Sequence, residues 1–76
     1  MVWGTLDEAL ESAHARARDV YGPGVAIELF ESPAAVSAKV WSRDGRAVLL
    51  VVREKTKRQA VDVLYEELVE REGGLK

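Results

Sequence analysis

The chain has 76 residues, enough for one domain spanning residues 1–76 and close to the lower size limit for a core without disulfides or metal ions. It contains no cysteine, which excludes disulfides, thiolate metal sites and thiol nucleophiles, and we expect a cytoplasmic protein. The net charge of -2 provides no overall attraction to nucleic acid or to an anionic membrane, and no apolar run is long enough to span one. Asparagine is absent and 32% of the residues are charged, which resembles the composition of thermophile proteins.

A first helix is predicted between Thr5 and Gly22. Thr5 and Glu8 have the spacing of a capping box, and Gly22 followed by Pro23 ends the helix. The apolar residues between them recur every three or four positions and form one stripe: Leu6, Ala9, Leu10, Ala13, Ala17, Val20 and Tyr21. Because this stripe is rich in alanine, we expect the helix to lie close to a sheet.

Residues 25–30 alternate between two sets of side chains, as a strand does, and residues 32–35 form a turn. If that turn is tight, Glu28 lies opposite Lys39, and this pair of opposite charges supports the register. The expected cross-strand pairs are Glu31 with Val36, Glu28 with Lys39 and Ala26 with Trp41.

A second hairpin is predicted at Asp44-Gly45, a favoured sequence for a two-residue type I′ turn with positive φ at both positions. Pairing Arg43 with Arg46 assigns the side chains of both strands to two faces. The predicted inner face contains Val36, Ala38, Val40, Ala47, Leu49 and Val51. The predicted outer face contains Lys39, Trp41, Val48, Leu50 and Val52, together with Phe30 from the preceding strand.

A second helix is predicted from Thr56, which forms a capping box with Gln59, to Gly73-Gly74. Strands joined by short turns are antiparallel, so the predicted fold is an α+β two-layer αβββα sandwich. It has a three-stranded meander with both helices on one face. The predicted core consists of Leu6, Leu10, Ala13, Ala17, Val25, Ile27, Leu29, Val36, Val40, Leu49, Val51, Val61, Leu64 and Leu68.

The predicted outer face is too apolar to remain wet on a monomer. We expect it to join copies of the chain into a homo-oligomer, most simply a two-fold dimer. The alternatives are coverage by residues 1–3 or the C-terminal tail, and tolerance of exposed apolar residues. The expected function is that of a small non-enzymatic, self-associating interaction module. The predicted interface residues are Phe30, Trp41, Val48, Leu50 and Val52.

Four basic residues surround the start of the second helix, where the helix dipole already presents positive charge. The far end of that helix is acidic, so both ends are charged against the dipole. An anion at the N-terminus, a neighbouring subunit or simple solvation would each account for this pattern. The candidate anion-binding residues are Arg53, Lys55, Lys57 and Arg58.

The order helix, three antiparallel strands, helix resembles the double-stranded-RNA-binding-domain family, and residues 55–60 (KTKRQA) resemble the basic start of its last helix. This resemblance implies RNA phosphates as partners of Lys55, Lys57 and Arg58. The family's Gly-Pro-x-His loop is replaced by residues 32–35 (SPAA). A second route to nucleic acid would be base stacking on Phe30 and Trp41.

No catalytic constellation is visible. His14 is the only histidine, and no serine has a base at a suitable spacing. Glu28 and Glu31 face opposite sides of their strand, and residues 22–24 (GPG) do not lead into a helix as a phosphate-binding loop does. We therefore expect no catalytic residue, no metal site and no cofactor.

Overall fold

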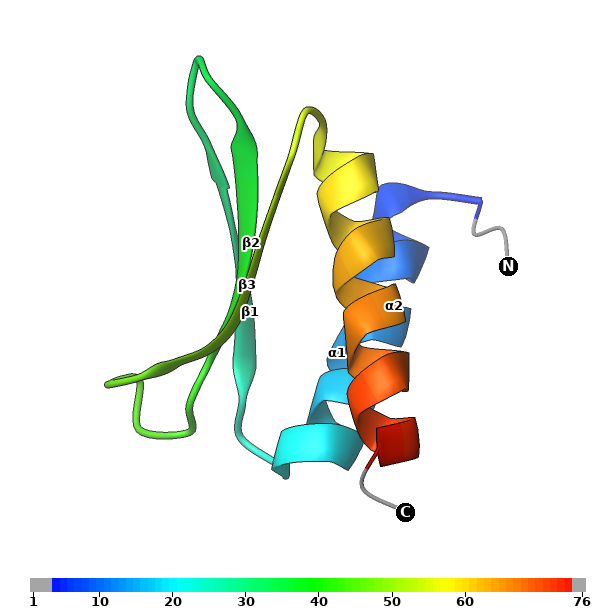
Figure 1. The fold of residues 1–76 in the computed structure, drawn as a ribbon, viewed down its shortest axis with the longest axis vertical. Helices are drawn as coiled ribbons and strands as arrows, with labels where there is room; N and C mark the ends of the chain where they lie inside the picture. The colour runs from blue at the N-terminus through cyan, green and yellow to red at the C-terminus, as the bar shows by residue number, and fades with distance from the viewer. Residues whose placement is uncertain (1–3, 75–76) are drawn as a thin grey trace.

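The computed structural model describes residues 4–74 and has the element order α1 (Leu6–Tyr21), β1 (Ala26–Glu31), β2 (Val36–Trp41), β3 (Val48–Glu54) and α2 (Lys57–Gly74). The strands form one antiparallel sheet in the order β1-β2-β3. Both helices cover the same face of this sheet, which leaves the other face without a second layer (Figure 1). The predicted αβββα sandwich is confirmed. Coverage of the open face by residues 1–3 or 75–76 lies outside the described residues.

Side-chain caps fix the start of each helix. Thr5 Oγ1 accepts a 3.1 Å hydrogen bond from the Glu8 amide, and Thr56 Oγ1 accepts one of 3.1 Å from the Gln59 amide. Each bond satisfies a helix N–H that has no partner within the helix. Gly22, with φ of 97°, ends α1 in a conformation that favours glycine. Both predicted N-caps are confirmed, and the Glu8 and Gln59 side chains reach back to the threonine hydroxyls, at 3.3 and 3.4 Å.

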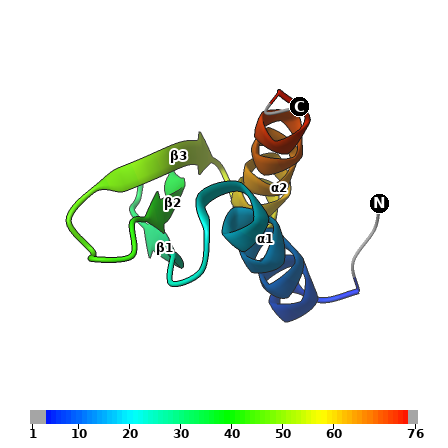
Figure 2. The same ribbon diagram turned by 90° about the horizontal axis from the view of Figure 1, so that it is seen from below.

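The helices are not equivalent in their contacts with the sheet. α2 packs on β2 and β3, whereas α1 packs mainly on α2 and lies toward the β1 side of the helical layer (Figure 2). The alanines Ala9, Ala13 and Ala17 are fully buried. Small side chains allow two helices to approach closely, and here α1 approaches α2. The expectation that α1 lies close to the sheet is therefore wrong.

The first hairpin has the predicted register. Glu28 lies opposite Lys39, Glu31 opposite Val36 and Ala26 opposite Trp41. The Ser32 amide donates a 2.9 Å hydrogen bond to the Ala35 carbonyl, so the turn is tight.

The second hairpin does not contain the predicted type I′ turn. Gly45 has a φ of 73°, but no residue other than glycine has a positive φ in residues 4–74. The loop is closed by Ser42 and Ala47, joined by a 2.8 Å bond from the Ser42 amide to the Ala47 carbonyl. Asp44 holds its tip by accepting from Ser42 Oγ at 2.6 Å and from the Arg46 amide at 3.0 Å. Because the Asp44 carboxylate accepts these two bonds within its own loop, the loop is held together without a positive φ at Asp44.

A β-bulge follows this loop. Trp41 lies opposite Val48, as predicted, but the next residue of β2, Val40, lies opposite Leu50, so Leu49 has no partner. One extra residue transfers every later side chain of β3 to the other face. The predicted core residues Leu49 and Val51 are therefore wrong, because they are 36% and 51% exposed.

The same bulge corrects the predicted interface. Leu50 is buried and Val52 packs against the core, so neither lies on the outer face. The other twelve predicted core residues are buried or packed against the core. The core also contains four residues outside the predicted core list: Ala9, Ala38, Leu50 and Ala60. Of these, Ala9 lies on the predicted helical stripe and Ala38 on the predicted inner face.

Candidate functional site

The uncovered side of the sheet, hereafter the outer face, is built from three cross-strand rows. These rows are Phe30-Ser37-Arg53, Glu28-Lys39-Val51 and Ala26-Trp41-Val48. Leu49 joins the last row because its neighbour Leu50 points into the core. Three of the predicted interface residues belong to this face: Phe30, Trp41 and Val48.

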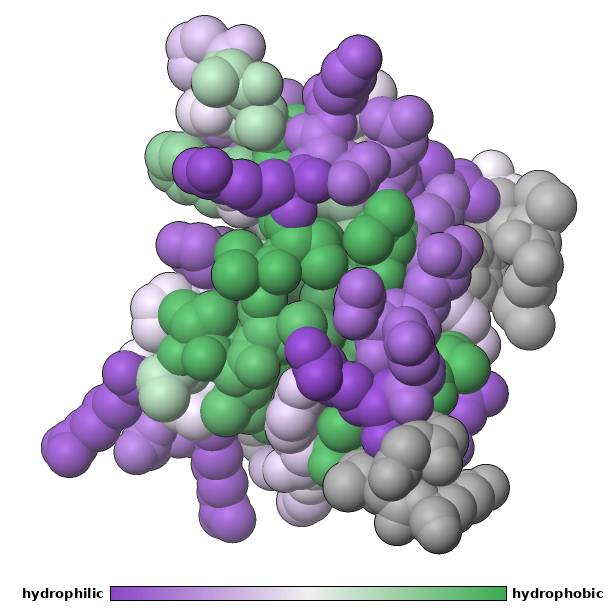
Figure 3. All heavy atoms as spheres, viewed as in Figure 1, coloured by the Kyte–Doolittle hydropathy of each residue, from purple (hydrophilic) through white to green (hydrophobic). Residues whose placement is uncertain are grey.

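Exposed apolar side chains gather on the outer face. Residues 4–74 contain five exposed large apolar residues, and four of them lie here: Phe30 at 59%, Val51 at 51%, Val48 at 42% and Leu49 at 36%. Three of these four belong to β3. Figure 3, which views the molecule from its β3 edge, shows an apolar area that runs over β3 and across the edge of the sheet to the adjoining side of α2. The apolar surface is therefore centred on β3.

Three polar side chains beside this apolar surface, those of Trp41, Glu28 and Lys39, contact one another. Trp41 Nε1 donates to Glu28 Oε1 at 3.3 Å, and the Lys39 ammonium lies 6.0 Å from the centre of the Trp41 ring. A polar group with a hydrogen-bond partner loses less on leaving water than one without. The outer face can therefore be covered without leaving the Trp41 N–H unpaired.

The four candidate anion-binding residues do not form one site. Lys57 Nζ lies 2.8 Å from Glu31 Oε1, and Arg58 Nε lies 3.2 Å from Asp62 Oδ1. Arg53 lies on the outer face, where it lines a shallow depression with Phe30, Lys39 and Val51. The exposed Lys55 lies between β3 and α2. Two of the four candidate cations are thus paired with carboxylates.

The acidic end of α2 has a partner that sequence reasoning missed. Arg16 of α1 donates to both carboxylate oxygens of Glu72, at 3.0 and 2.9 Å, and lies 5.8 Å from the centre of the Tyr65 ring. A hydrogen bond with the Tyr65 hydroxyl and the neighbouring Glu72 raise the pKa of Arg16 above its usual range. The two helices run in the same direction, so their C-terminal ends meet here (Figure 1). Arg16 offsets the negative charge of Glu72 at the end of α2, and Arg18 lies in the last turn of α1.

Basic and acidic residues are concentrated in different parts of the chain. Seven of the 11 basic residues lie between Lys39 and Arg58, the segment that runs from β2 to the start of α2. Nine of the 13 acidic residues lie on the two helices. The modest net charge of -2 therefore conceals a basic segment, residues 39–58, which has seven basic residues against two acidic ones, and an acidic remainder of the helical layer.

His14 is half-buried, and its Nε2 donates to the Val25 carbonyl oxygen at 2.9 Å. Within residues 4–74, no group of three His, Cys, Asp or Glu side chains is placed to hold a metal ion. None of the helices in the same range is both long and apolar enough to cross a membrane.

Comparison with known proteins provides no relative. No protein-family model matches the chain, and no curated protein or solved structure is significantly similar to it. The resemblance to double-stranded-RNA-binding domains therefore stays a prediction.

Proposed function

We propose that this protein is a non-enzymatic interaction module that self-associates through its outer face. The observation that carries this proposal is the exposure of Phe30 and Val51, 59% and 51%, on a face that neither helix covers. Clustered apolar surface of this kind is typical of interaction sites. The interface residues we assign are Phe30, Trp41, Val48, Leu49 and Val51.

A two-fold dimer is the simplest arrangement. A two-fold axis brings one patch against its own copy, so a single apolar face closes the assembly. Three strands of six residues offer a face of about 14 by 20 Å, which is small for a stable interface. We therefore expect a weak dimer. Lys39 and Arg53 can keep their charged ends in water at the rim while their stems are covered.

Sedimentation equilibrium tests this arrangement with the full chain. We expect a mass that rises from 8.4 kDa toward twice that value as protein concentration increases. Val51→Gln places an amide in the interface without a partner, which costs about 1–3 kcal/mol and weakens the dimer by about 5-fold or more. Val69→Gln is the matched control, because Val69 is 40% exposed on α2, away from the outer face. A wild-type mass that stays at 8.4 kDa at about 1 mM contradicts self-association.

A second candidate function is binding of single-stranded nucleic acid to the same face. The specific observation is the depression where the exposed Phe30 ring lies with two cations, Lys39 and Arg53. Aromatic rings stack on bases, and neighbouring cations bind phosphates. The basic character of the segment from Lys39 to Arg58 favours the same partner.

One pair of substitutions separates the two candidates. Phe30→Leu removes the stacking ring but keeps an apolar side chain, so it should weaken oligonucleotide binding and leave the dimer largely intact. Val51→Gln should do the reverse. Binding of a fluorescent single-stranded RNA should also weaken steeply with salt, because phosphate contacts release counterions. No binding at low salt excludes this second function.

A further inference from the structure

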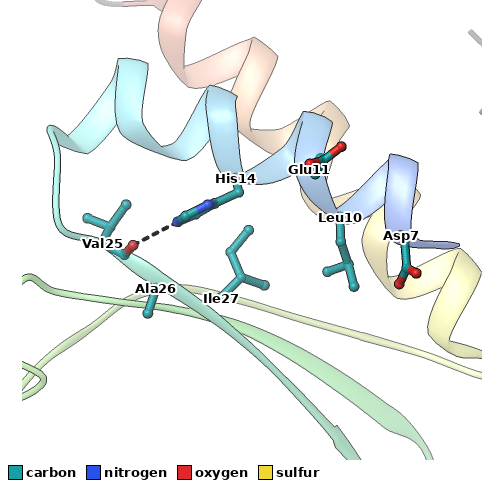
Figure 4. Close-up of a pocket in the computed structure, with 7 residues that line it drawn as sticks. All are labelled: Asp7, Leu10, Glu11, His14, Val25, Ala26 and Ile27. Carbon is teal, nitrogen blue, oxygen red and sulfur yellow. Dashed lines mark hydrogen bonds between the residues drawn. The ribbon is translucent and has the colours of Figure 1, made fainter.

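A groove runs between α1 and β1, on the opposite side of the sheet from the outer face. It has a volume of about 570 Å³ and is lined by Asp7, Leu10, Glu11, His14, Val25, Ala26 and Ile27. Figure 4 shows Leu10 of α1 and Ile27 of β1 directed into the space between the two elements. We call this space the α1–β1 groove. Its size falls in the range of pockets that hold small ligands.

The free edge of β1 faces this groove with unpaired backbone groups. In an antiparallel pair, alternate residues direct both N–H and C=O toward the partner strand, and the residues between them direct both away. Ser32 bonds Ala35 across the turn, so the even-numbered residues of β1 face β2. Ile27 and Leu29 therefore face the free edge. The Val25 carbonyl, which faces the same way, confirms this alternation because it accepts from His14.

The helical layer is wider than the sheet beneath it. Two helices side by side span about 20 Å, whereas three strands span about 14 Å. α2 is seated on β2 and β3, so the excess width lies under α1, beyond β1. The sheet is thus narrower than the helical layer by about 6 Å, which is roughly the width of one strand.

The charged side chains that α1 contributes to the groove are both acidic. Asp7 and Glu11 line it from α1, and no lysine or arginine within residues 4–74 lines it. Glu28, on the outer side of β1, is a third carboxylate beside the same edge. A segment that carries cations would therefore be attracted to this edge, and an acidic one repelled.

We propose that the α1–β1 groove binds an extended segment of another protein, which adds to the sheet as a fourth strand beside β1. The main chain of this segment pairs with Ile27 and Leu29. Its alternate apolar side chains contact Leu10 and Ile27, and the lysines or arginines between them lie near Glu28 on the outer side, while Asp7 and Glu11 attract the positive charge of the segment from the groove side. This is strand addition to an exposed sheet edge.

A second copy of the chain fits this edge poorly. Pairing two copies through β1 would place four helices, about 40 Å across, over six strands that span about 29 Å. It would also bring Asp7 and Glu11 of one copy toward those of the other. A segment without helices of its own avoids both problems. This binding site is independent of the proposed dimer, and Val51→Gln should leave it unchanged.

The probe is an eight-residue peptide, acetylated and amidated, in which valine alternates with lysine or arginine. We expect it to slow amide hydrogen exchange at Ile27 and Leu29 and to shift their NMR signals, while the amides that face β2 change less. A control peptide with the same side chains, N-methylated at alternate residues, should bind at least about 10-fold more weakly, because it lacks the pairing donors.

Charge at the rim is tested separately. Glu11→Gln should weaken binding of the peptide roughly 2- to 5-fold, whereas Glu66→Gln, which removes an equally exposed carboxylate from α2, should not. Strand addition is excluded if the peptide leaves Ile27 and Leu29 unaffected at millimolar concentration, or if the N-methylated peptide binds equally well. Protection of these two amides that rises with protein concentration alone would assign the edge to a second copy and also overturn the proposal.

Discussion

Val40 and Leu50 lie directly opposite each other on the buried face of the sheet, although the loop between their strands would align Val40 with Leu49. The bulge at Leu49 shifts the register by one residue and so places Val40 opposite Leu50. α2 packs on β2 and β3, the two strands that contain this pair. Two adjacent leucines in β3 therefore have opposite environments.

Replacing Leu49 or Leu50 by alanine should lower the free energy of unfolding by unequal amounts. Leu50→Ala removes a side chain that is only 8% exposed and should lower the free energy of unfolding by about 2–4 kcal/mol. Leu49→Ala, at a position that is 36% exposed, should cost less than about 1 kcal/mol. Urea unfolding of the two variants at one protein concentration measures the difference. Equal losses, or a larger loss at Leu49, would contradict the bulged register.

Deletion of one of the two leucines should be tolerated. The shortened β3 can pair with β2 without a bulge, since Trp41 still lies opposite Val48 and a leucine still follows opposite Val40. Deletion of Lys39 is the control, because β2 is the central strand and losing one residue there shifts its pairing with both neighbours. We expect cooperative thermal unfolding, followed by circular dichroism, for the leucine deletion alone.

Two glycines with positive φ should differ in their tolerance of a methyl group. Gly24 has a φ of 92°, and a Cβ there would lie 2.7 Å from Cγ of Arg43, whereas Gly45 has nothing within 4 Å of the added atom. Both alanine variants carry the backbone strain of about 1–2 kcal/mol. Only Gly24→Ala must also displace Arg43, so it should be the less stable of the two in thermal unfolding. A less stable Gly45→Ala variant would be inconsistent with this contact.

The Asp44 loop should lose stability in acid. Hydrogen bonds from the Ser42 hydroxyl and the Arg46 amide lower the pKa of Asp44 below its ordinary value of 3.8. A carboxyl whose pKa is depressed on folding stabilises the fold fully above its unfolded pKa, and this contribution disappears as pH falls through the folded pKa. NMR titration of the Arg46 amide should have its midpoint below 3.8. Ser42→Ala should raise the midpoint; an unchanged midpoint would exclude the Ser42 bond as the main cause.

The sequence contains enough information for the caps, the element order and the first hairpin, because each depends on local chemistry. The Glu28-Lys39 pair and a tight turn specify one register for β1 and β2. β3 is different, since residues 48–52 are all aliphatic. Shifting its pairing by one residue exchanges Leu49 and Val51 for Leu50 and Val52, the same two residue types, so hydrophobic alternation cannot distinguish the two registers.

The α1–β1 groove and the Arg16-Glu72 contact were also beyond sequence reasoning. Both depend on where α1 lies relative to α2 and the sheet, and an apolar stripe specifies which face is buried but not which neighbour it meets. The alanines of α1 are buried either way, against α2 or against strands. The Arg16-Glu72 pair joins residues 56 positions apart, a distance at which charge spacing has no predictive value.

The separation of the basic segment 39–58 from the acidic α1 and the acidic remainder of α2 should also affect how the protein behaves toward charged surfaces. A molecule with a net charge of -2 would ordinarily pass through a cation exchanger near neutral pH. This one can turn its basic segment 39–58 toward a negative matrix and α1 with the rest of α2 toward a positive one, because short-range fields depend on the charges nearest the surface. It should be retained by both kinds of resin at low ionic strength, with an orientation on each that is the reverse of the other.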